Sequence, residues 1–312
     1  MKKYIGKRLA GMIVVLLGVS ILSFVFIALS GRDPAEIMAR KGSLNATAEQ
    51  IEAVRTEMGL DKPLPVRYVH WLKGLFSGEM GDSFYTHRPI KQDLKEFLPV
   101  SFYLVSLSLL WIILLTVPIS LICARWRNGA ADHIIRWLSL GGVCMPTFWL
   151  GFLLLLGFAV KLGWFHVLPD PGIKGYILPS FTLALPCACG LLRLMRSSLL
   201  AELGSDYVQY AKARGLSSSR ILVRHILRNS LPPVITLFCQ YLGYLVAGSV
   251  VVESVFSLKG LGSYLVNCVN AADSIATASC IVIIAGIFVL ANLAGDVLNR
   301  LLCPWMVREQ NA

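Results

Sequence analysis

Apolar residues gather in long runs along this chain, and polar stretches separate the runs. The first run, residues 9–30, holds 22 residues without a charged side chain. At about 1.5 Å per residue, a helix of that length crosses the roughly 30 Å hydrocarbon core of a bilayer. Five further runs of this kind cover about 99–124, 137–160, 177–192, 231–252 and 275–295. The pattern predicts an all-α polytopic membrane protein with about six transmembrane helices, of which 177–192 is the weakest because Pro179 and Pro186 interrupt it.

The composition agrees with this class of protein. Hydrophobic residues make up 56% of the 312 positions and the mean hydropathy is +0.67, whereas a soluble domain is about 45–50% apolar. A basic start, with Lys2, Lys3, Lys7 and Arg8, also fits a cleaved signal peptide. The first run is longer than the roughly 7–15 apolar residues of such a peptide, so we expect a retained helix.

The distribution of charge predicts the orientation. The segments that we place inside the cell hold 16 of the 29 Lys and Arg residues but five of the 18 Asp and Glu residues, and the other side holds 13 of each kind. These inner segments are 1–8, 125–136, 193–228 and 296–312. Because basic residues gather on the cytoplasmic side of membrane proteins, we expect both termini in the cytoplasm. The net charge of +11 then needs no nucleic acid as a partner, and the sequence contains no basic soluble module that would bind one.

The runs and the charges divide the chain into four parts. Residues 1–30 form a cytoplasmic stub with the first transmembrane helix, and 31–98 form an extracytoplasmic helical region. Residues 99–301 form the transmembrane core, which includes a polar cytoplasmic loop at 193–233. Residues 302–312 form a cytoplasmic tail.

Three short helices are predicted in the outer region. Thr47 and Gln50 form a capping box that starts the first helix, and Gly59 ends it. Pro65 fits the first turn of the second helix, and 90–98 forms the third. The second helix is expected to turn one apolar face inward, and this face consists of Val69, Leu72, Leu75 and Phe76.

The pattern at 193–233 predicts two short helices with a break between them. Residues 201–214 favour a first helix, Gly215 can adopt the positive φ that ends it, and Ser217 can cap the second helix. The prolines at 232–233 are expected to start the next span. A helix–break–helix in the cytoplasm suits insertion into a groove of a partner protein, and it suits equally a solvated connector whose basic face meets anionic lipid.

Signatures of enzyme chemistry are absent from the sequence. There is no G-x-x-x-x-G-K-[ST] phosphate loop, no H-E-x-x-H zinc motif and no G-x-S-x-G nucleophile motif. The eight cysteines have no C-x-x-C spacing, and the five histidines are scattered. We therefore expect no catalytic residue, no metal site and no cofactor bound by this chain itself.

The cytoplasmic loop contains a pattern known from a family of transporters. Residues 206–216 fit D-Y-V-x-x-A-x-A-x-G-L, and 225–233 fit H-x-L-R-N-x-L-x-P. This resembles the signature loop of permeases in the peptide/nickel subfamily of type I ABC importers, although Gln209-Tyr210-Ala211 stands where other subfamilies have Glu-Ala-Ala. Nearly the whole chain shares the resemblance, through motifs at 31–34, 58–64, 81–83, 145–151, 253–256 and 260–262.

The resemblance implies a type I ABC importer permease, multi-pass in a bacterial cytoplasmic (inner) membrane. Besides membrane lipid, its partners would be a second homologous permease, two ATP-binding subunits that hold ATP and Mg²⁺, and an extracytoplasmic solute-binding protein. Glu253, Gly260 and Gly262, near the last outer loop, are candidates for gating or solute contact. The residues expected to couple the loop to the ATPases are Asp206, Tyr207, Ala211, Ala213, Arg214, Gly215, Leu216, Arg220, Arg224, His225, Arg228 and Asn229.

Three stretches depart from the family pattern. Lys259 stands where the family has a proline before Gly-Leu-Gly, and 272–274 is Ala-Asp-Ser where an Arg-Asp-Tyr-like stretch is common. Near the end, Cys303-Pro304-Trp305 replaces Asp-Pro-Arg. The effect of these departures on partner choice does not follow from the sequence.

The solute follows less directly from the resemblance than the architecture does. Peptides and nickel, free or chelated, are both common solutes of the subfamily. The overall motif match and the short outer loop between the third and fourth spans favour nickel or a metal chelate, with a di- or oligopeptide as the alternative. Two functions of a different class are an ATP-independent channel or carrier and a membrane-embedded enzyme.

Overall fold

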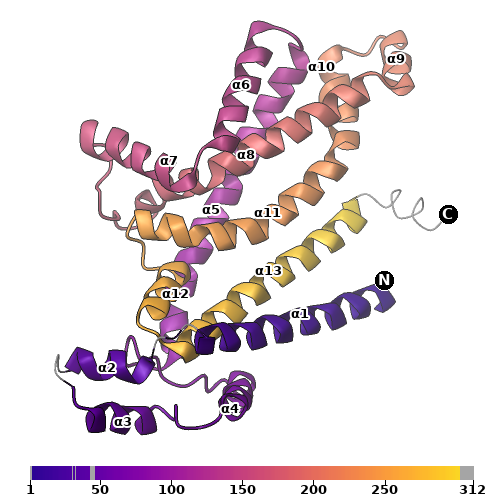
Figure 1. Ribbon diagram of the computed structural model, residues 1–312. Helices are drawn as coiled ribbons and strands as arrows, with labels where there is room; N and C mark the ends of the chain where they lie inside the picture. Colours follow the sequence, from indigo (N-terminus) through magenta and orange to yellow (C-terminus); the bar gives the residue numbers. More distant parts are fainter. Residues whose placement is uncertain (1, 30, 32, 43–45, 303–312) are drawn as a thin grey trace. The chain divides into compact units, whose positions relative to one another are not determined.

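The computed structural model describes residues 2–29, 31, 33–42 and 46–302. These residues form helices joined by turns and contain no named strand, with one isolated β-bridge between Asp82 and Pro89. The all-α prediction is therefore confirmed. The contacts group the chain into two compact units, each described here by itself: one joins residues up to Ser101 with Leu258–Val289, and the other joins Phe102–Ser257 with the residues from Leu290 onward (Figure 1).

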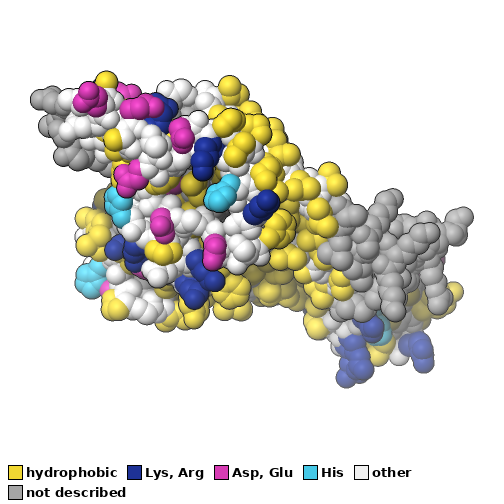
Figure 2. Space-filling view, turned by 90° about the horizontal axis from the view of Figure 1, so that it is seen from below, with side chains coloured by type: hydrophobic (Ala, Val, Ile, Leu, Met, Phe, Trp, Pro, Cys, Tyr) yellow, Lys and Arg dark blue, Asp and Glu magenta, His cyan; other side chains and the backbone are white. Residues whose placement is uncertain are grey.

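The first unit contains the short helices of residues 31–98, the short helix α12 and all or part of three longer helices. Its elements are α1 (Lys2–Leu29), α2 (Pro34–Gly42), α3 (Ala48–Glu57), α4 (Leu64–Ser77), the first turns of α5 (Ile90–Arg125), α12 (Leu261–Asn270) and most of α13 (Ser274–Leu302). Acidic and basic side chains are mixed over the face formed by α2–α4, as Figure 2 shows. This surface therefore presents no field of a single sign to a solute or partner.

Local signals of the outer region were predicted correctly. The Thr47 hydroxyl accepts from the Gln50 N–H at 3.3 Å, and the Gln50 side chain accepts from the Thr47 N–H at 3.0 Å, so the capping box starts α3. Gly59 follows the helix with φ 62°, which only glycine adopts without a steric penalty. Pro65 lies in the first turn of α4. These features depend on residues within one turn of each other.

The predicted apolar face of α4 was partly wrong. Leu72 and Leu75 pack against the core of the unit, but Phe76 is 83% exposed and Val69 is also exposed. The core position is taken by Trp71, whose ring lies 5.0 Å from that of Phe24 in α1. The Trp71 Nε1 also donates to the Ser279 hydroxyl of α13 at 3.0 Å. This buried hydrogen bond fixes the rotation of α4, since a tryptophan N–H buried without an acceptor would be costly.

Two buried carboxylates bind the segment at 81–93 to α12 and α13. Asp273 accepts from the Ser83 hydroxyl (2.7 Å), the Tyr85 N–H (3.1 Å) and the Ala276 N–H (3.0 Å). Asp93, equally buried, accepts from Arg88 Nη2 (2.6 Å) and from the hydroxyl of Tyr264 (2.9 Å). Each carboxylate thus replaces the water that it loses on burial with several donors.

The second unit contains the remaining helices. They are α6 (Ala130–Cys144), α7 (Thr147–Leu154), the π-helix η1 (Leu155–Lys161), α8 (Lys174–Leu203), α9 (Asp206–Ala213), α10 (Ser218–Ile221), the π-helix η2 (Leu222–Ile226) and α11 (Leu227–Val255). Figure 1 shows α9 and α10 at the end of the hairpin that α8 and α11 form. The loop singled out in the sequence is therefore presented at the tip of two long helices.

Six apolar segments were predicted to span, and the structure qualifies that count. In the part of the chain that is described, four helical stretches are long and apolar enough to cross a membrane: Ile90–Arg125, Lys174–Leu203, Ser218–Val255 and Ser274–Gly295. The segment expected at 137–160 is a pair of helices bent by 108° around Met145 and Pro146, which makes a fifth span if the pair is counted as one. The first segment contributes a shorter apolar helix, Gly11–Phe26.

Prolines interrupt the long helices less than expected. α8 continues through Pro179 and Pro186, so the fourth span was predicted correctly but the prolines do not interrupt its helix. α11 continues through 232–233, so the span start predicted there was wrong. The short helix predicted at 90–98 is likewise the beginning of α5, which continues through Pro99. Neighbouring helices accommodate prolines in membranes.

The packing of α5 on α8 is an example of such accommodation. The Ser108 hydroxyl donates to the Ser180 carbonyl at 3.1 Å, and the Thr116 hydroxyl donates to the Ala188 carbonyl at 3.3 Å. These two hydrogen bonds lie on either side of Pro186 along α8. They hold the helix against its neighbour where proline weakens its own hydrogen bonding.

α6 and α8 are joined at two points. Arg196 Nε and Nη2 donate to the two carboxylate oxygens of the buried Asp132, each at 2.6 Å. Further along, a Cβ placed on Gly142 would lie 2.5 Å from Cys189 Sγ, so only glycine permits this close approach. One contact is charged and the other is steric, and together they fix both the register and the spacing of the two helices.

Replacing Asp273 with alanine is expected to destabilise the protein. The change leaves the buried Ser83 hydroxyl and the Tyr85 N–H without this acceptor, at about 1–3 kcal/mol for each unsatisfied group. We expect the apparent Tm of the purified protein in detergent to fall by roughly 5 °C. The matched control is Asp61→Ala, because Asp61 is exposed. Equal melting curves for the two variants would show that the Asp273 contacts contribute nothing to stability.

Candidate functional site

The loop between α8 and α11 contains more breaks than the sequence indicated. A single helix was expected over 201–214, but α8 ends at Leu203 and α9 begins at Asp206. Between them, Ser205 is extended, with φ −73° and ψ 150°. The loop is therefore a separate two-turn helix followed by a tight turn, and it is not an extension of the preceding span.

Gly215 makes the turn after α9. It has φ 77°, its N–H donates to the Lys212 carbonyl at 2.9 Å, and the next N–H, of Leu216, donates to the Ala211 carbonyl at 3.2 Å. This pair of bonds is typical of a helix that ends on a left-handed residue. A Cβ added at Gly215 would meet no atom within 4 Å. Within this chain, glycine is therefore favoured at position 215 by the left-handed backbone conformation. A lack of space for a side chain is not the reason.

The underside of the loop is apolar and buried. Val208 of α9 and Ile221 of α10 are almost fully buried, as are Leu222 and Ile226 of η2. They anchor the short helices to the ends of α8 and α11. The loop is therefore a packed element and not a flexible tether.

Tyr207 adds a polar anchor. Its hydroxyl donates to Glu202 Oε2, at the end of α8, at 2.7 Å. Burial, and then the hydrogen bond to the Glu202 carboxylate, raise the pKa of Tyr207 to about 12, while a hydrogen bond with Asn229 acts in the opposite direction. The hydroxyl consequently keeps its proton at physiological pH and stays a donor to Glu202. α9 is thereby fixed to α8 by a side chain as well as by the backbone.

The outer surface of the loop is basic with two apolar side chains. Tyr210 is 73% exposed and Val223 is also exposed. Sequence analysis missed both, although an aromatic residue in a polar loop was the available signal. Of the predicted coupling residues, Leu216 and Ala211 are half-buried. The exposed ones are Asp206, Ala213, Arg214, Gly215, Arg220, Arg224, His225, Arg228 and Asn229.

Ser217 occupies the position that was predicted, but it does not act as predicted. It is the residue before α10, with extended φ and ψ, and its hydroxyl makes no capping hydrogen bond. The helix that follows changes to the π-helix η2 after one turn. Arg220 and Arg224 nevertheless stay exposed on the loop surface, as the spacing predicted.

The outer-loop candidates are divided between the two units. Glu253 lies inside α11, fully buried, and not just outside a span as expected. Gly260 precedes α12, where its N–H donates to the Ser263 hydroxyl at 3.0 Å, and Gly262 is buried in that helix. Glu253 belongs to the second unit and the two glycines belong to the first. A wholly buried Glu253 offers no surface for a solute in this conformation.

The structure describes some of the departures from the family pattern but not the one near the end of the chain. Ala272 has φ 54°, a left-handed conformation that alanine adopts only at a steric cost, and it directly precedes the buried Asp273. Cys303 and the two residues after it lie outside the described residues.

No group of three or more His, Cys, Asp or Glu side chains that would hold a metal ion occurs in the part of the chain that the structure covers.

Comparisons with known proteins agree along nearly the whole length of the chain. Residues 116–308 match the family described as the binding-protein-dependent transport system inner membrane component, and residues 1–105 match the N-terminal family of such membrane components. The glutathione transport system permease protein GsiC of Pectobacterium atrosepticum is 38% identical over 97% of this chain and 98% of its own length. The GsiC proteins of Salmonella typhimurium and Escherichia coli K12 are 36% and 34% identical over the same shares.

The hydroxyl of Tyr207 is expected to hold α9 in place. Tyr207→Phe removes the hydrogen bond to the Glu202 carboxylate, and hydrogen bonds to charged groups contribute about 1.5–3 kcal/mol. Amide hydrogens of 206–214 should then exchange at least roughly tenfold faster, as hydrogen–deuterium exchange would measure. Tyr210→Phe is the matched control, because its exposed hydroxyl has no such contact. Unchanged exchange in Tyr207→Phe would contradict the anchoring role.

Proposed function

This chain belongs to the family of binding-protein-dependent transport system inner membrane components, the permeases of type I ABC importers, and on that premise we propose that it forms half of an ATP-driven import path for a peptide-like solute. The single observation that supports a coupled permease most is the loop around α9. It is exposed and basic on its outer side and anchored by buried residues beneath. A rigid helix at the tip of two spans suits the transmission of force from a partner.

The partners follow from the family to which the chain belongs. With no phosphate-binding loop in the sequence, ATP and Mg²⁺ would be held by two ATP-binding subunits. A second permease would complete the path, and an extracytoplasmic binding protein would deliver the solute. Tyr210 and Val223 are exposed apolar side chains on a loop that also exposes four arginines, which is a composition expected at a protein interface.

Alternating access is the mechanism that this arrangement supports. Closure of the ATPases around bound ATP would displace α9. Because α9 is fixed to Glu202 and packed through Val208, the displacement would pass to α8 and α11 rather than be absorbed in a loose connector. Movement of these two helices would open the path outward, and ATP hydrolysis would reset it.

The orientation rests on charge. The segments around the loop and the two termini contain the excess of basic residues, so we place them in the cytoplasm by the positive-inside rule. The helices α2–α4 then lie on the extracytoplasmic side. This places the mixed acidic and basic surface in Figure 2 where a binding protein would arrive.

A peptide-like solute is better supported than nickel. The sequence favoured nickel on its overall motif match and a short outer loop, but the relatives reported above are named as glutathione permeases. The alternative of a peptide solute therefore becomes the main proposal.

Uptake measurements test the solute. A strain that lacks this transport system should lose uptake of labelled glutathione or of small peptides and regain it with the intact chain and its partners. Nickel uptake should not change. Restored nickel uptake without peptide uptake would overturn the solute proposal, while transport by this chain without any ATPase would overturn the coupled mechanism.

Gly215 is expected to matter for coupling through its backbone conformation. Gly215→Val places a β-branched residue at φ 77°, at about 1–2 kcal/mol or more, and should distort the turn between α9 and α10. We expect solute uptake and solute-stimulated ATP hydrolysis to fall by roughly tenfold with normal membrane insertion. Gly215→Asn is the control, since asparagine tolerates this conformation.

A larger substitution tests access to the docking surface. Gly215→Trp adds bulk outward, because the chain itself leaves the space open. It should uncouple ATP hydrolysis from uptake. Unchanged uptake and ATP hydrolysis in both Gly215→Val and Gly215→Trp would mean that this turn does not touch the ATPase.

A further inference from the structure

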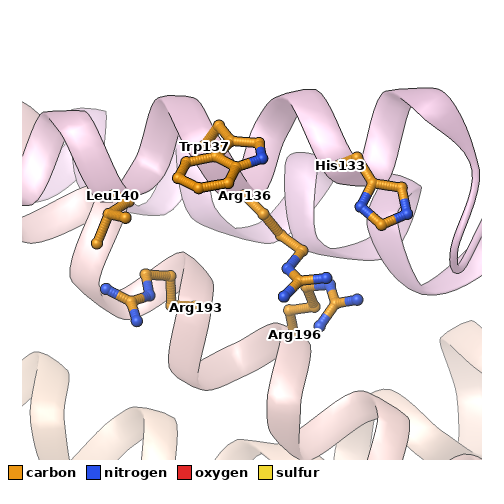
Figure 3. Close-up of a pocket in the computed structure, with 6 residues that line it drawn as sticks. All are labelled: His133, Arg136, Trp137, Leu140, Arg193 and Arg196. Atoms are coloured by element: carbon orange, nitrogen blue, oxygen red, sulfur yellow. The ribbon is translucent and has the colours of Figure 1, made fainter.

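A cavity of about 480 Å³ opens between α6 and α8, and the residues of α8 that line it lie before α9. Figure 3 shows side chains of both helices facing it. α6 contributes positions i, i+3, i+4 and i+7, one stripe of a helix, and α8 contributes positions i and i+3. The lining residues are His133, Arg136, Trp137, Leu140, Arg193 and Arg196. Three of the six are arginines.

Positive charge in this cavity is not balanced. Asp132 is the acidic neighbour, and both of its oxygens are already occupied by Arg196. One of these oxygens also accepts from the Asn128 N–H at 3.0 Å. Within the described parts of the chain, Arg136 and Arg193 form no ion pair. Arg136 and Arg193 therefore line this cavity without a counter-charge among the described residues; in Figure 3 Arg136 lies beside Arg196 and Arg193 lies beside Leu140. Several guanidinium groups around one cavity favour an anion with several acceptor oxygens.

The surroundings of the cavity are apolar on one side. Trp137 is 73% exposed, and Ile134 and Leu138 of the same helix are exposed as well. These residues begin where the basic segment 125–136 passes into the apolar run at 137–160. Tryptophan prefers this boundary between headgroups and acyl chains. The depth of the cavity thus corresponds to that of lipid headgroups on the side that we place in the cytoplasm.

We propose that this cavity binds the phosphate-bearing headgroup of an anionic membrane lipid. Arg136 and Arg193 bind the phosphate oxygens, and Arg196 is held in position by Asp132. The acyl chains lie along the exposed apolar side of α6. Basic cavities between transmembrane helices on the cytoplasmic side suit such headgroups. The proposal goes beyond solute transport and does not depend on which solute the chain carries.

A soluble phosphate would bind the arginines through the same chemistry as a lipid headgroup. The surroundings of the cavity distinguish these two ligands. A soluble phosphate would gain nothing from the exposed tryptophan and leucine beside the cavity. A lipid gains from both parts, because its headgroup meets the arginines and its chains meet the apolar stripe. The continuity of charged and apolar contacts on one helix therefore favours the lipid.

Lipid retention by the purified full-length chain tests the proposal. Native mass spectrometry in detergent would compare added phosphatidylglycerol with phosphatidylcholine of the same acyl chains. We expect one phosphatidylglycerol to be retained in preference. Arg136→Gln combined with Arg193→Gln should weaken this binding by roughly 25-fold, since each basic residue near an anionic surface contributes about a factor of five.

The matched control carries the same loss of charge elsewhere. Arg125→Gln combined with Arg127→Gln changes two exposed arginines on the same side that do not line the cavity, and it should retain the lipid. Arg136→Lys combined with Arg193→Lys keeps the charge and should retain most of the binding. This pair supplies the comparison if the glutamine variant does not fold.

Several results would overturn the proposal. Equal retention of phosphatidylcholine, or unchanged retention in the glutamine variant, would remove the case for a headgroup site. Displacement of the lipid by millimolar inorganic phosphate would indicate a site for soluble phosphate. Displacement by an added ATPase subunit would indicate that a protein carboxylate occupies the arginines.

Discussion

A helix inside a bilayer has no water with which to satisfy its backbone, and this constraint governs how the second unit is built. Its longest helices continue through prolines that would end a helix in a soluble protein. In α8, hydroxyl groups of a neighbouring helix, Ser108 and Thr116, donate to backbone carbonyls on either side of Pro186. Unbroken helices are in turn what a transporter needs, because a break would absorb a displacement that has to travel across the membrane.

The polar parts of the chain are built differently from the long membrane helices. Here a few buried side chains hold short elements in place. α9 has only eight residues, too few to be stable alone in water. Val208 beneath it and the hydroxyl of Tyr207 beside it supply the tertiary contacts that isolated helices lack. In the outer region Asp273 and Asp93 do the same for a segment with little regular structure. Buried side chains thus hold the short elements of this protein in place, and the exposed surfaces of these elements remain available to partners.

Sequence reasoning succeeded where the cause of a feature was local. The capping box at Thr47 and Gln50 and the turn at Gly215 each depend on residues within a few positions, and both were predicted. The apolar runs also predicted the long helices, because the requirement for about 20 apolar residues acts on one segment at a time.

Features that depend on distant residues were not predictable. Trp71 took the core position of α4 because Ser279, far along the chain, accepts its N–H. The hydrogen bonds on either side of Pro186 in α8 come from hydroxyls of another helix. The cavity between α6 and α8 requires a pairing of Asp132 with Arg196 that no spacing in the sequence indicates. A single sequence lists the residues that make such contacts, but it does not show which of them lie next to each other in the fold.

The double attachment of α6 to α8 has a consequence for time scales. The ion pair at Asp132 opposes separation of these helices, and the close contact at Gly142 opposes their sliding. They therefore turn as one body, and the sharp bend after α6 lies outside that body. The space between them keeps its dimensions while the rest of the unit changes conformation. A molecule lodged there would exchange at the slow rate at which the helix pair itself comes apart, independently of the rate of turnover.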